Sequence, residues 1–174
     1  MNYEIDSINK IKNNNGDIYW YTSLENQSEL LVTSWCNGVS GIGKFLIAAM
    51  STFDCPEAKP LYVGIKSTIK NNNLNLTNNQ CHGTTSIGEF YLESLHVLNE
   101  PIAAEEIKKI INLLLDNSHK SEGVTQWLSE DNESFTFDYM GGSTGIYSFI
   151  LRALYMFENN SLSLSEKTKE LAYE

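Results

Sequence analysis

Two cysteines and one histidine in this chain have the residue types and spacing of metal ligands. Cys81 and His82 are adjacent in the segment NQCHGTTSIGEF, and Cys36 begins the similar segment CNGVSGIGKF. Zinc prefers thiolate sulfur and imidazole nitrogen, and three such protein ligands leave one tetrahedral position for a substrate. The adjacent pair alone is weak support, because a single reduced cysteine is most often a small buried hydrophobe. The prediction of a zinc site therefore depends on whether the fold brings Cys36 to the pair.

The segments that carry these residues belong to a pattern that repeats three times. CNGVSGIGKFLIAAMSTF, CHGTTSIGEFYLESLHVL and MGGSTGIYSFILRALYMF, which begin at Cys36, Cys81 and Met140, align without gaps. Each has a glycine at its third place and an isoleucine four residues later. From that isoleucine, mostly apolar residues recur at offsets of three, four, seven, eight and eleven, which is the spacing of one helical face. We therefore expect three glycine-rich turns, each leading into an amphipathic helix.

The same offsets define the face that each helix is expected to bury. The faces comprise Ile42, Phe45, Leu46, Ala49, Met50 and Phe53 in the first copy, Ile87, Phe90, Tyr91, Ser94, Leu95 and Leu98 in the second, and Ile146, Phe149, Ile150, Ala153, Leu154 and Phe157 in the third. Ser86 and Glu89 also have the spacing of a capping box, which predicts how the second helix begins.

Further helices are expected between the copies. PIAAEEIKKIINLLLDN begins with Pro101, which suits a first helical turn, and has an apolar stripe formed by Ile107, Ile110, Ile111, Leu114 and Leu115. PEAKPLYVGIKSTIK and the terminal SLSLSEKTKELAYE are weaker candidates, and GDIYWYTS, ELLVTSW and ESFTFDY have the composition of short extended segments. The pattern predicts an all-α fold of helix-pair repeats with short β segments in the connections, as one domain over residues 1–174.

The alignment of the copies favours a zinc site over incidental cysteines. Cys36 and Cys81 occupy the same place in consecutive copies, and stacked repeats bring equivalent positions close together. Both precede a helix N-terminus, where the helix macrodipole favours the thiolate. The third copy has Met140 at this place, which is not a plausible zinc ligand. The predicted ligand set is therefore Cys36, Cys81 and His82.

Other side chains with reactive groups are interpreted as packing or surface residues. Cys55 precedes a proline and has no counterpart in the other copies, so we expect it to be partly buried packing. His96 and His119 are expected at the surface or in packing contacts. Polar residues on the first helix of each copy, among them Glu89 and Arg152, either line a central cavity or belong to solvated helix faces.

Composition and charge exclude several classes of function. The 174 residues are 41% hydrophobic and 20% charged, which suits one globular domain with a core. The net charge is −10 and no basic stripe is present, so nucleic acid and anionic membranes are not expected partners. The sequence has neither the apolar core of a signal peptide nor a run long enough to span a bilayer, so we expect a cytoplasmic location with reduced thiols.

Taken together, SWCNGVSGIG, NQCHGTTSIGEF and GGSTGIYSFILRAL resemble the lanthionine synthetase C-like proteins, the cyclases of lantibiotic biosynthesis. The resemblance covers most of the chain. It implies an α/α toroid of seven inner and seven outer helices, of which this chain looks like the last three repeats. It also implies zinc (Zn²⁺) at the rim of the central cavity, with Cys36, Cys81 and His82 as the ligands at the matching positions.

The reaction implied by the resemblance is an intramolecular Michael-type addition. A cysteine of a dehydrated precursor peptide adds to dehydroalanine or dehydrobutyrine and closes a thioether ring, and zinc lowers the pKa of the substrate thiol. The family's general acid/base histidine and its neighbouring aspartate have no match here, so the catalytic acid/base is unknown. We therefore expect a second chain that supplies the N-terminal repeats. Asn37 stands where many relatives carry histidine or tyrosine.

Two other functions stay open at the level of sequence. A catalytically inactive zinc protein that binds the peptide for another enzyme, or a truncated remnant of a cyclase, would keep the same ligands without closing a ring. A purely structural helical protein would contain the cysteines incidentally. Stoichiometric zinc would separate the cyclase and the zinc-containing peptide-binding protein from the purely structural protein. Ring closure would then separate a cyclase from a peptide-binding module.

Overall fold

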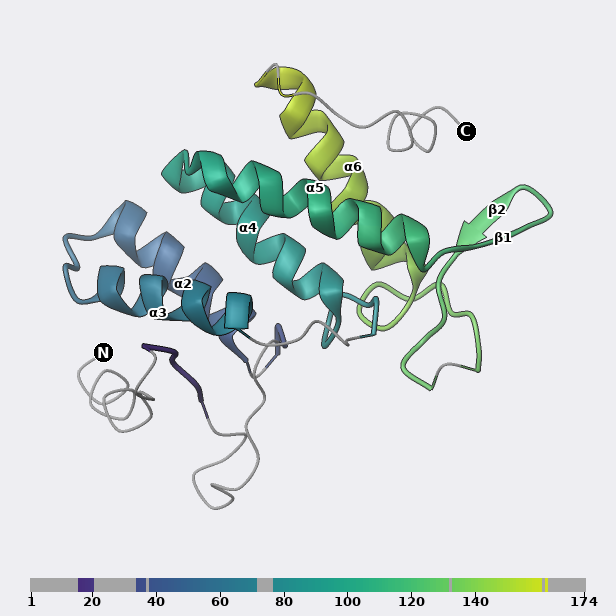
Figure 1. The fold of residues 1–174 in the computed structure, drawn as a ribbon, viewed down its shortest axis with the longest axis horizontal. Helices are drawn as coiled ribbons and strands as arrows, with labels where there is room; N and C mark the ends of the chain where they lie inside the picture. Colours follow the sequence, from purple (N-terminus) through teal and green to yellow (C-terminus); the bar gives the residue numbers. More distant parts are fainter. Residues whose placement is uncertain are drawn as a thin grey trace. The chain divides into compact units, whose positions relative to one another are not determined.

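The structure is a computed structural model, and it describes residues 16–20, 34–36, 38–71, 77–131, 133–160 and 162. The chain divides into two compact units, Met1–Asn75 and Leu76–Glu174. The described residues form helices α2 to α6 and one two-stranded hairpin (Figure 1). This content confirms the prediction of an all-α fold with helix-pair packing. The assignment of residues 1–174 to a single domain stays a prediction.

In the first unit, α2 (Val39–Thr52) packs against α3 (Ala58–Asn71). The segment 16–20 lies along α3, because Thr68 Oγ1 accepts from the Ile18 N–H at 2.7 Å and donates to the Ile18 carbonyl at 2.8 Å. The described part of GDIYWYTS is therefore not a strand, in contrast to the expectation. Both backbone groups of Ile18 are hydrogen-bonded by the hydroxyl of the buried Thr68. Of ELLVTSW, the described residues include Ser34 and Trp35, and the rest lies outside them.

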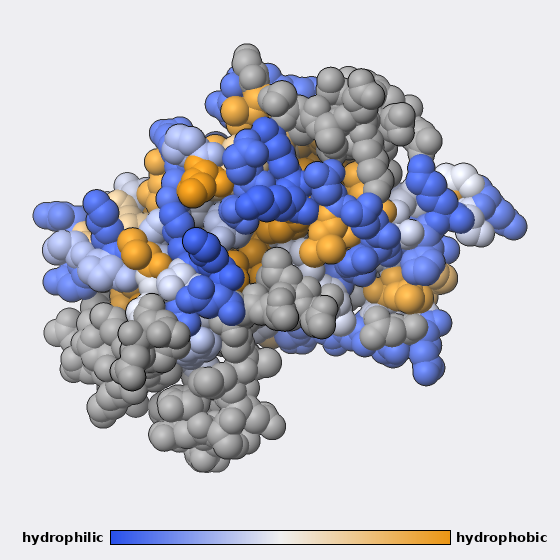
Figure 2. Space-filling model, viewed as in Figure 1, coloured by the Kyte–Doolittle hydropathy of each residue, from blue (hydrophilic) through white to orange (hydrophobic). Residues whose placement is uncertain are grey.

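In the second unit, α4 (Thr84–Leu98) packs against both α5 (Pro101–Asp116) and α6 (Ser143–Asn159). Pro101 occupies the first turn of α5, as predicted, and all five residues of the predicted apolar stripe are buried. The opposite face of α5 carries exposed charged residues, and Figure 2 shows a hydrophilic surface along this helix. None of the helices in the described part of the chain is long and apolar enough to cross a membrane.

The connection between α5 and α6 contains a hairpin that the sequence did not predict. Strands β1 (His119–Ser121) and β2 (Val124–Gln126) pair antiparallel, with Ser121 opposite Val124. The two turn residues, Glu122 and Gly123, have φ of 51° and 79°, and positive φ at both central residues is typical of a tight hairpin turn. The predicted extended segment ESFTFDY forms no strand, and only Phe135 takes part in an isolated bridge, with Leu128.

The predicted buried faces of the three repeat helices agree with the structure to different degrees. In α6 all six residues are buried, and in α4 the first four are buried while Leu95 and Leu98 are half-buried. In α2 the prediction was wrong for Phe45 and Phe53, which are 56% and 68% exposed. The buried face of α2 instead follows Val39, Ser40, Gly43, Leu46, Ile47 and Ala49. Its sequence is apolar over more than one face, so periodicity alone did not determine which face is buried.

The packing of α4 on α6 depends on a glycine and an ion pair. A Cβ on Gly88 would lie 2.4 Å from Phe149 Cζ, so any larger residue here would require the Phe149 ring to move. The next residue of α4, Glu89, is buried, and its carboxylate pairs with Arg152 of α6. A buried carboxylate needs such a partner, so these two residues connect the helices. The predicted capping box at Glu89 is wrong, because Gly83 is the N-cap and the hydroxyl of Ser86 donates to the Gly83 carbonyl at 2.8 Å.

Candidate metal centre

The turns that precede α2, α4 and α6 have the same backbone conformation. Their N-cap residues are Gly38, Gly83 and Gly142, with φ of −113°, −102° and −118° and ψ of −170°, −170° and −168°. The alignment of the three copies is therefore confirmed in the turns as well as in the helices. Any residue adopts these extended values, so the need for glycine has another cause.

Close contacts with the preceding backbone explain the glycines. The Thr84 N–H, just after Gly83, donates to the Thr77 carbonyl at 2.8 Å, and the equivalent Ser143 N–H donates to the Thr136 carbonyl at 2.9 Å. Each turn thus closes on a carbonyl seven residues earlier. A Cβ on Gly83 would lie 2.3 Å from the Thr77 oxygen, which no side chain tolerates.

This contact predicts a large difference between two neighbouring glycines of the third turn. A Cβ on Gly142 would lie 2.4 Å from the Thr136 carbonyl oxygen, whereas a Cβ on Gly141 would meet only the Asp138 carboxylate at 3.4 Å. We expect Gly142→Ala to lower the free energy of unfolding by about 1–3 kcal/mol, the usual cost of overpacking. Gly141→Ala is the matched control and is expected to change it by less than about 0.5 kcal/mol. Urea unfolding followed by circular dichroism measures both, and equal midpoints would contradict the assignment.

In the second unit, the turns of consecutive copies are hydrogen-bonded to each other at their aligned first positions. The Cys81 N–H donates to the Met140 carbonyl at 2.9 Å. Cys81 and Met140 are the residues that begin the second and third copies. Equivalent positions of these two repeats therefore lie side by side, as the stacking of repeats predicts.

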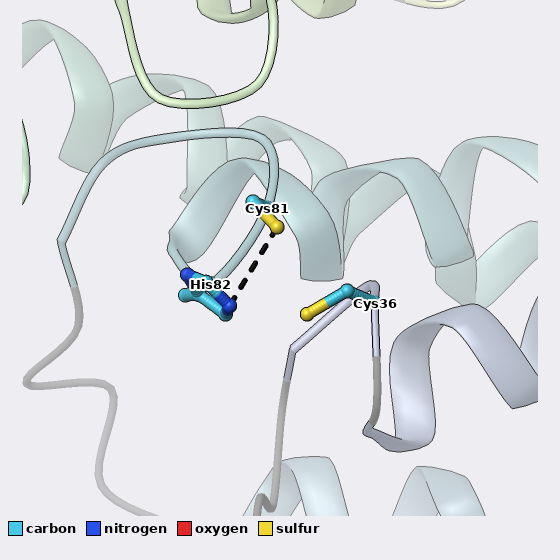
Figure 3. A group of neighbouring side chains, drawn as sticks. All are labelled: Cys36, Cys81 and His82. Carbon is cyan, nitrogen blue, oxygen red and sulfur yellow. Dashed lines mark hydrogen bonds between the residues drawn. The ribbon is translucent and has the colours of Figure 1, made fainter.

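Cys81 and His82 point toward one another in the turn before α4 (Figure 3), with 3.6 Å between Sγ and Nε2. A tetrahedral zinc ion with Zn–S of about 2.3 Å and Zn–N of about 2.0–2.1 Å separates the two donor atoms by about 3.5–3.6 Å. The pair therefore has the spacing of two zinc ligands. A thiol–imidazole hydrogen bond spans the same distance, so metal analysis is the deciding measurement. Cys81 is half-buried and His82 is exposed, which leaves the pair accessible from solvent.

Two further contacts fix the orientation of His82. Its backbone N–H donates to Asn79 Oδ1 at 2.8 Å, and its Nδ1 contacts the Glu130 carboxylate on the side of the ring away from Cys81. The hydrogen bond from His82 holds the pKa of Glu130 below its usual range, although partial desolvation opposes this shift. Sequence reasoning missed Glu130, because it lies in a connection between repeats and has no aligned counterpart.

The third predicted ligand, Cys36, belongs to the first unit. It lies in the turn before α2 (Figure 3), is exposed, and is followed two residues later by the N-cap Gly38. Its local setting thus matches that of Cys81. The adjacent Asn37 lies outside the described residues. We propose that Cys36 joins Cys81 and His82 as a ligand.

The remaining cysteine and histidines have the settings expected of packing and surface residues. Cys55 is 9% exposed and its Sγ lies 3.7 Å from a carboxylate oxygen of Glu57. His96 is exposed in the last turn of α4, and His119 is exposed with its ring 5.4 Å from that of Phe135.

The chain matches the model of a known protein family. The family model of the lanthionine synthetase C-like proteins matches residues 1–165. The chain belongs to this family. Membership confirms the resemblance drawn from the glycine-turn repeats and assigns this lanthionine synthetase C-like chain to proteins of the lanthionine cyclase type, which act on peptides. No curated protein matches the chain.

Proposed function

We propose that this lanthionine synthetase C-like chain is a zinc-dependent thioether cyclase, or the zinc-bearing part of one, with Cys36, Cys81 and His82 as the zinc ligands. The observation that carries the proposal is the 3.6 Å separation of the Cys81 and His82 donor atoms, which suits one edge of a tetrahedral zinc site. Cys36 supplies the third ligand. The set offers two sulfur donors and one nitrogen donor and leaves one position for a substrate.

The role of Cys36 is supported by the equivalence of the turns. The turns before α2 and α4 share their N-cap conformation, and Cys36 and Cys81 precede those N-caps by the same number of residues. The hydrogen bond from Cys81 to Met140 brings together the aligned positions of the second and third copies. Repeats of one architecture stack in a regular way, so the same relation between the first and second copies would bring Cys36 to Cys81.

The reaction is the addition of a peptide thiolate to a dehydroamino acid. The sulfur–carbon bond forms at the β-carbon as the π bond breaks, and the α-carbon takes up a proton that balances the one lost by the thiol. No oxidant or reductant is consumed. Zinc, when bound, lowers the pKa of the substrate thiol so that thiolate is available near neutral pH. The chain contributes Cys36 and Cys81 from the turns before α2 and α4 together with His82, and each would bind zinc in its deprotonated form.

Ring closure on a dehydrated, cysteine-containing peptide tests the proposal. The peptide is incubated with the zinc-loaded chain, with the chelator-treated chain and with the re-zincated chain, each with and without a protein carrying the remaining repeats. Ring closure blocks alkylation of the peptide thiol without a change in peptide mass. We expect protection from alkylation that is lost on chelation and restored by zinc, in at least one of the two mixtures.

The alternative outcomes of this assay are distinct. Stoichiometric zinc and peptide binding with full alkylation in every mixture would indicate a catalytically inactive, zinc-containing peptide-binding protein or a cyclase remnant. A chain without zinc under reducing conditions would reject the metal site and with it the cyclase. Ring closure only in the mixture would support the prediction that a second chain supplies the N-terminal repeats.

A further inference from the structure

We propose that Glu130 is a positioning residue that orients His82 for metal binding. Its carboxylate holds the Nδ1–H of the imidazole, so that Nε2 is directed toward Cys81. This inference rests on the proposed zinc site and adds a residue outside the repeats to it. The contact joins a connecting loop to the turn before α4 across 48 residues of sequence.

Stabilisation of the fold does not account for the contact between His82 and Glu130. The two side chains are 42% and 51% exposed, and exposed ion pairs contribute about 0–1 kcal/mol. The geometry of the contact instead fixes the orientation of the His82 ring. Glu130 contacts Nδ1, whereas Cys81 Sγ lies 3.6 Å from Nε2 on the other side of the same ring. The imidazole is therefore held between a carboxylate and a thiol, with one nitrogen assigned to each.

The loop that carries Glu130 is itself held in place. Asp131 Oδ1 accepts from the backbone N–H groups of Glu133 and Ser134 at 2.9 and 3.1 Å and from the Ser129 hydroxyl at 2.6 Å. The Ser129 N–H also donates to the Ser134 carbonyl at 2.9 Å. The hydrogen bonds to its carboxylate, first of all that from the Ser129 hydroxyl, lower the pKa of Asp131 well below its usual range. Because Glu130 lies within this closed turn, between Ser129 and Asp131, its carboxylate is presented from a defined backbone.

The Glu130 carboxylate determines which nitrogen of the His82 ring carries the proton. An ionised carboxylate only accepts hydrogen bonds, so its partner nitrogen must carry the proton. In neutral imidazole the other nitrogen, Nε2, then keeps its lone pair for a metal ion. Removing such an outer hydrogen-bond partner of a metal ligand typically weakens metal affinity by about 10–100-fold.

Zinc affinity and the tautomer of His82 together test the role of Glu130. Competition with a chromogenic chelator at fixed pH gives the zinc Kd of the full chain, of Glu130→Ala and of Glu130→Gln. We expect Glu130→Ala to bind zinc about 10–100-fold more weakly. Glu130→Gln keeps an acceptor oxygen without the charge, so its loss is expected to be smaller. The matched control is Glu133→Gln, which changes an exposed carboxylate of the same loop and should leave the Kd unchanged.

Nitrogen NMR of the metal-free protein provides a readout that a merely structural role would not move. In the wild type the His82 resonances should report a protonated Nδ1, and in Glu130→Ala they should shift toward a mixture of tautomers. If the wild type binds zinc but the Glu130 variants keep both its Kd and its tautomer, this inference fails while the proposed function stands. If the wild type binds no zinc at all, the proposed function fails first.

Discussion

Cys81→Ala is expected to purify without zinc, whereas Cys55→Ala is expected to keep the full amount of the wild type. Cys81 is the residue whose Sγ lies at zinc-ligand distance from His82 Nε2, and a site of three protein ligands that loses one retains only two. The loss of affinity should exceed the roughly 10–100-fold that follows removal of an outer-shell partner. Metal analysis after gel filtration under reducing conditions, combined with the chelator competition described for Glu130, measures both variants.

Cys55 is a suitable control because it is the remaining cysteine of the chain and its Sγ faces Glu57 in the first unit. Both substitutions remove a thiol, so a change that depends only on thiol content would affect them equally. Cys36→Ala extends the test to the proposed ligand in the first unit and should resemble Cys81→Ala. Retention of stoichiometric zinc by Cys81→Ala would reject the site. Loss of zinc from Cys81→Ala but not from Cys36→Ala would reject only the placement of Cys36.

The helices were predictable because their signals are local and repeated. Gly83 and Gly142 each precede a helix with the same apolar spacing, and the structure gives them nearly identical dihedral angles. Pro101 and the stripe that follows it likewise combine a start signal with a period. Such features depend on residues within a few turns of each other, so no knowledge of tertiary contacts is needed.

Features that depend on distant contacts were missed or misjudged. Phe45 and Phe53 fit the helical period, but the packing of α2 against α3 selects a different face. The segment 16–20 looks like a strand, but it hydrogen-bonds to a buried threonine of α3. The hairpin turn contains Glu122 at a positive φ, where glycine, asparagine or aspartate is the usual signal.

The residues of the candidate metal centre also differ in how far the sequence predicted them. The neighbouring positions of Cys81 and His82 are a property of the sequence itself, and their alignment on a glycine turn identified them. Glu130 reaches His82 from a loop without any repeat pattern, so nothing in the sequence linked the two. Cys36 is an intermediate case. Its local turn was predictable from the alignment, but its partners depend on how the repeats stack.

Trp127→Ala is expected to lower the free energy of unfolding by about 3–5 kcal/mol, the usual cost of truncating a buried tryptophan. Trp127 is 0% exposed, its Nε1–H donates to the Leu114 carbonyl at 2.6 Å, and its ring meets that of Tyr147 edge-on at 5.2 Å. Truncation thus leaves a cavity and removes the partner of a carbonyl in the last turn of α5, a group that has no partner within a helix.

Phe137→Ala, which truncates a 64% exposed aromatic of the same unit, should change the free energy of unfolding by less than about 0.5 kcal/mol. Urea unfolding followed by circular dichroism avoids the loss of tryptophan fluorescence, and equal stability of the two variants would show that Trp127 does not hold α5 and α6 together.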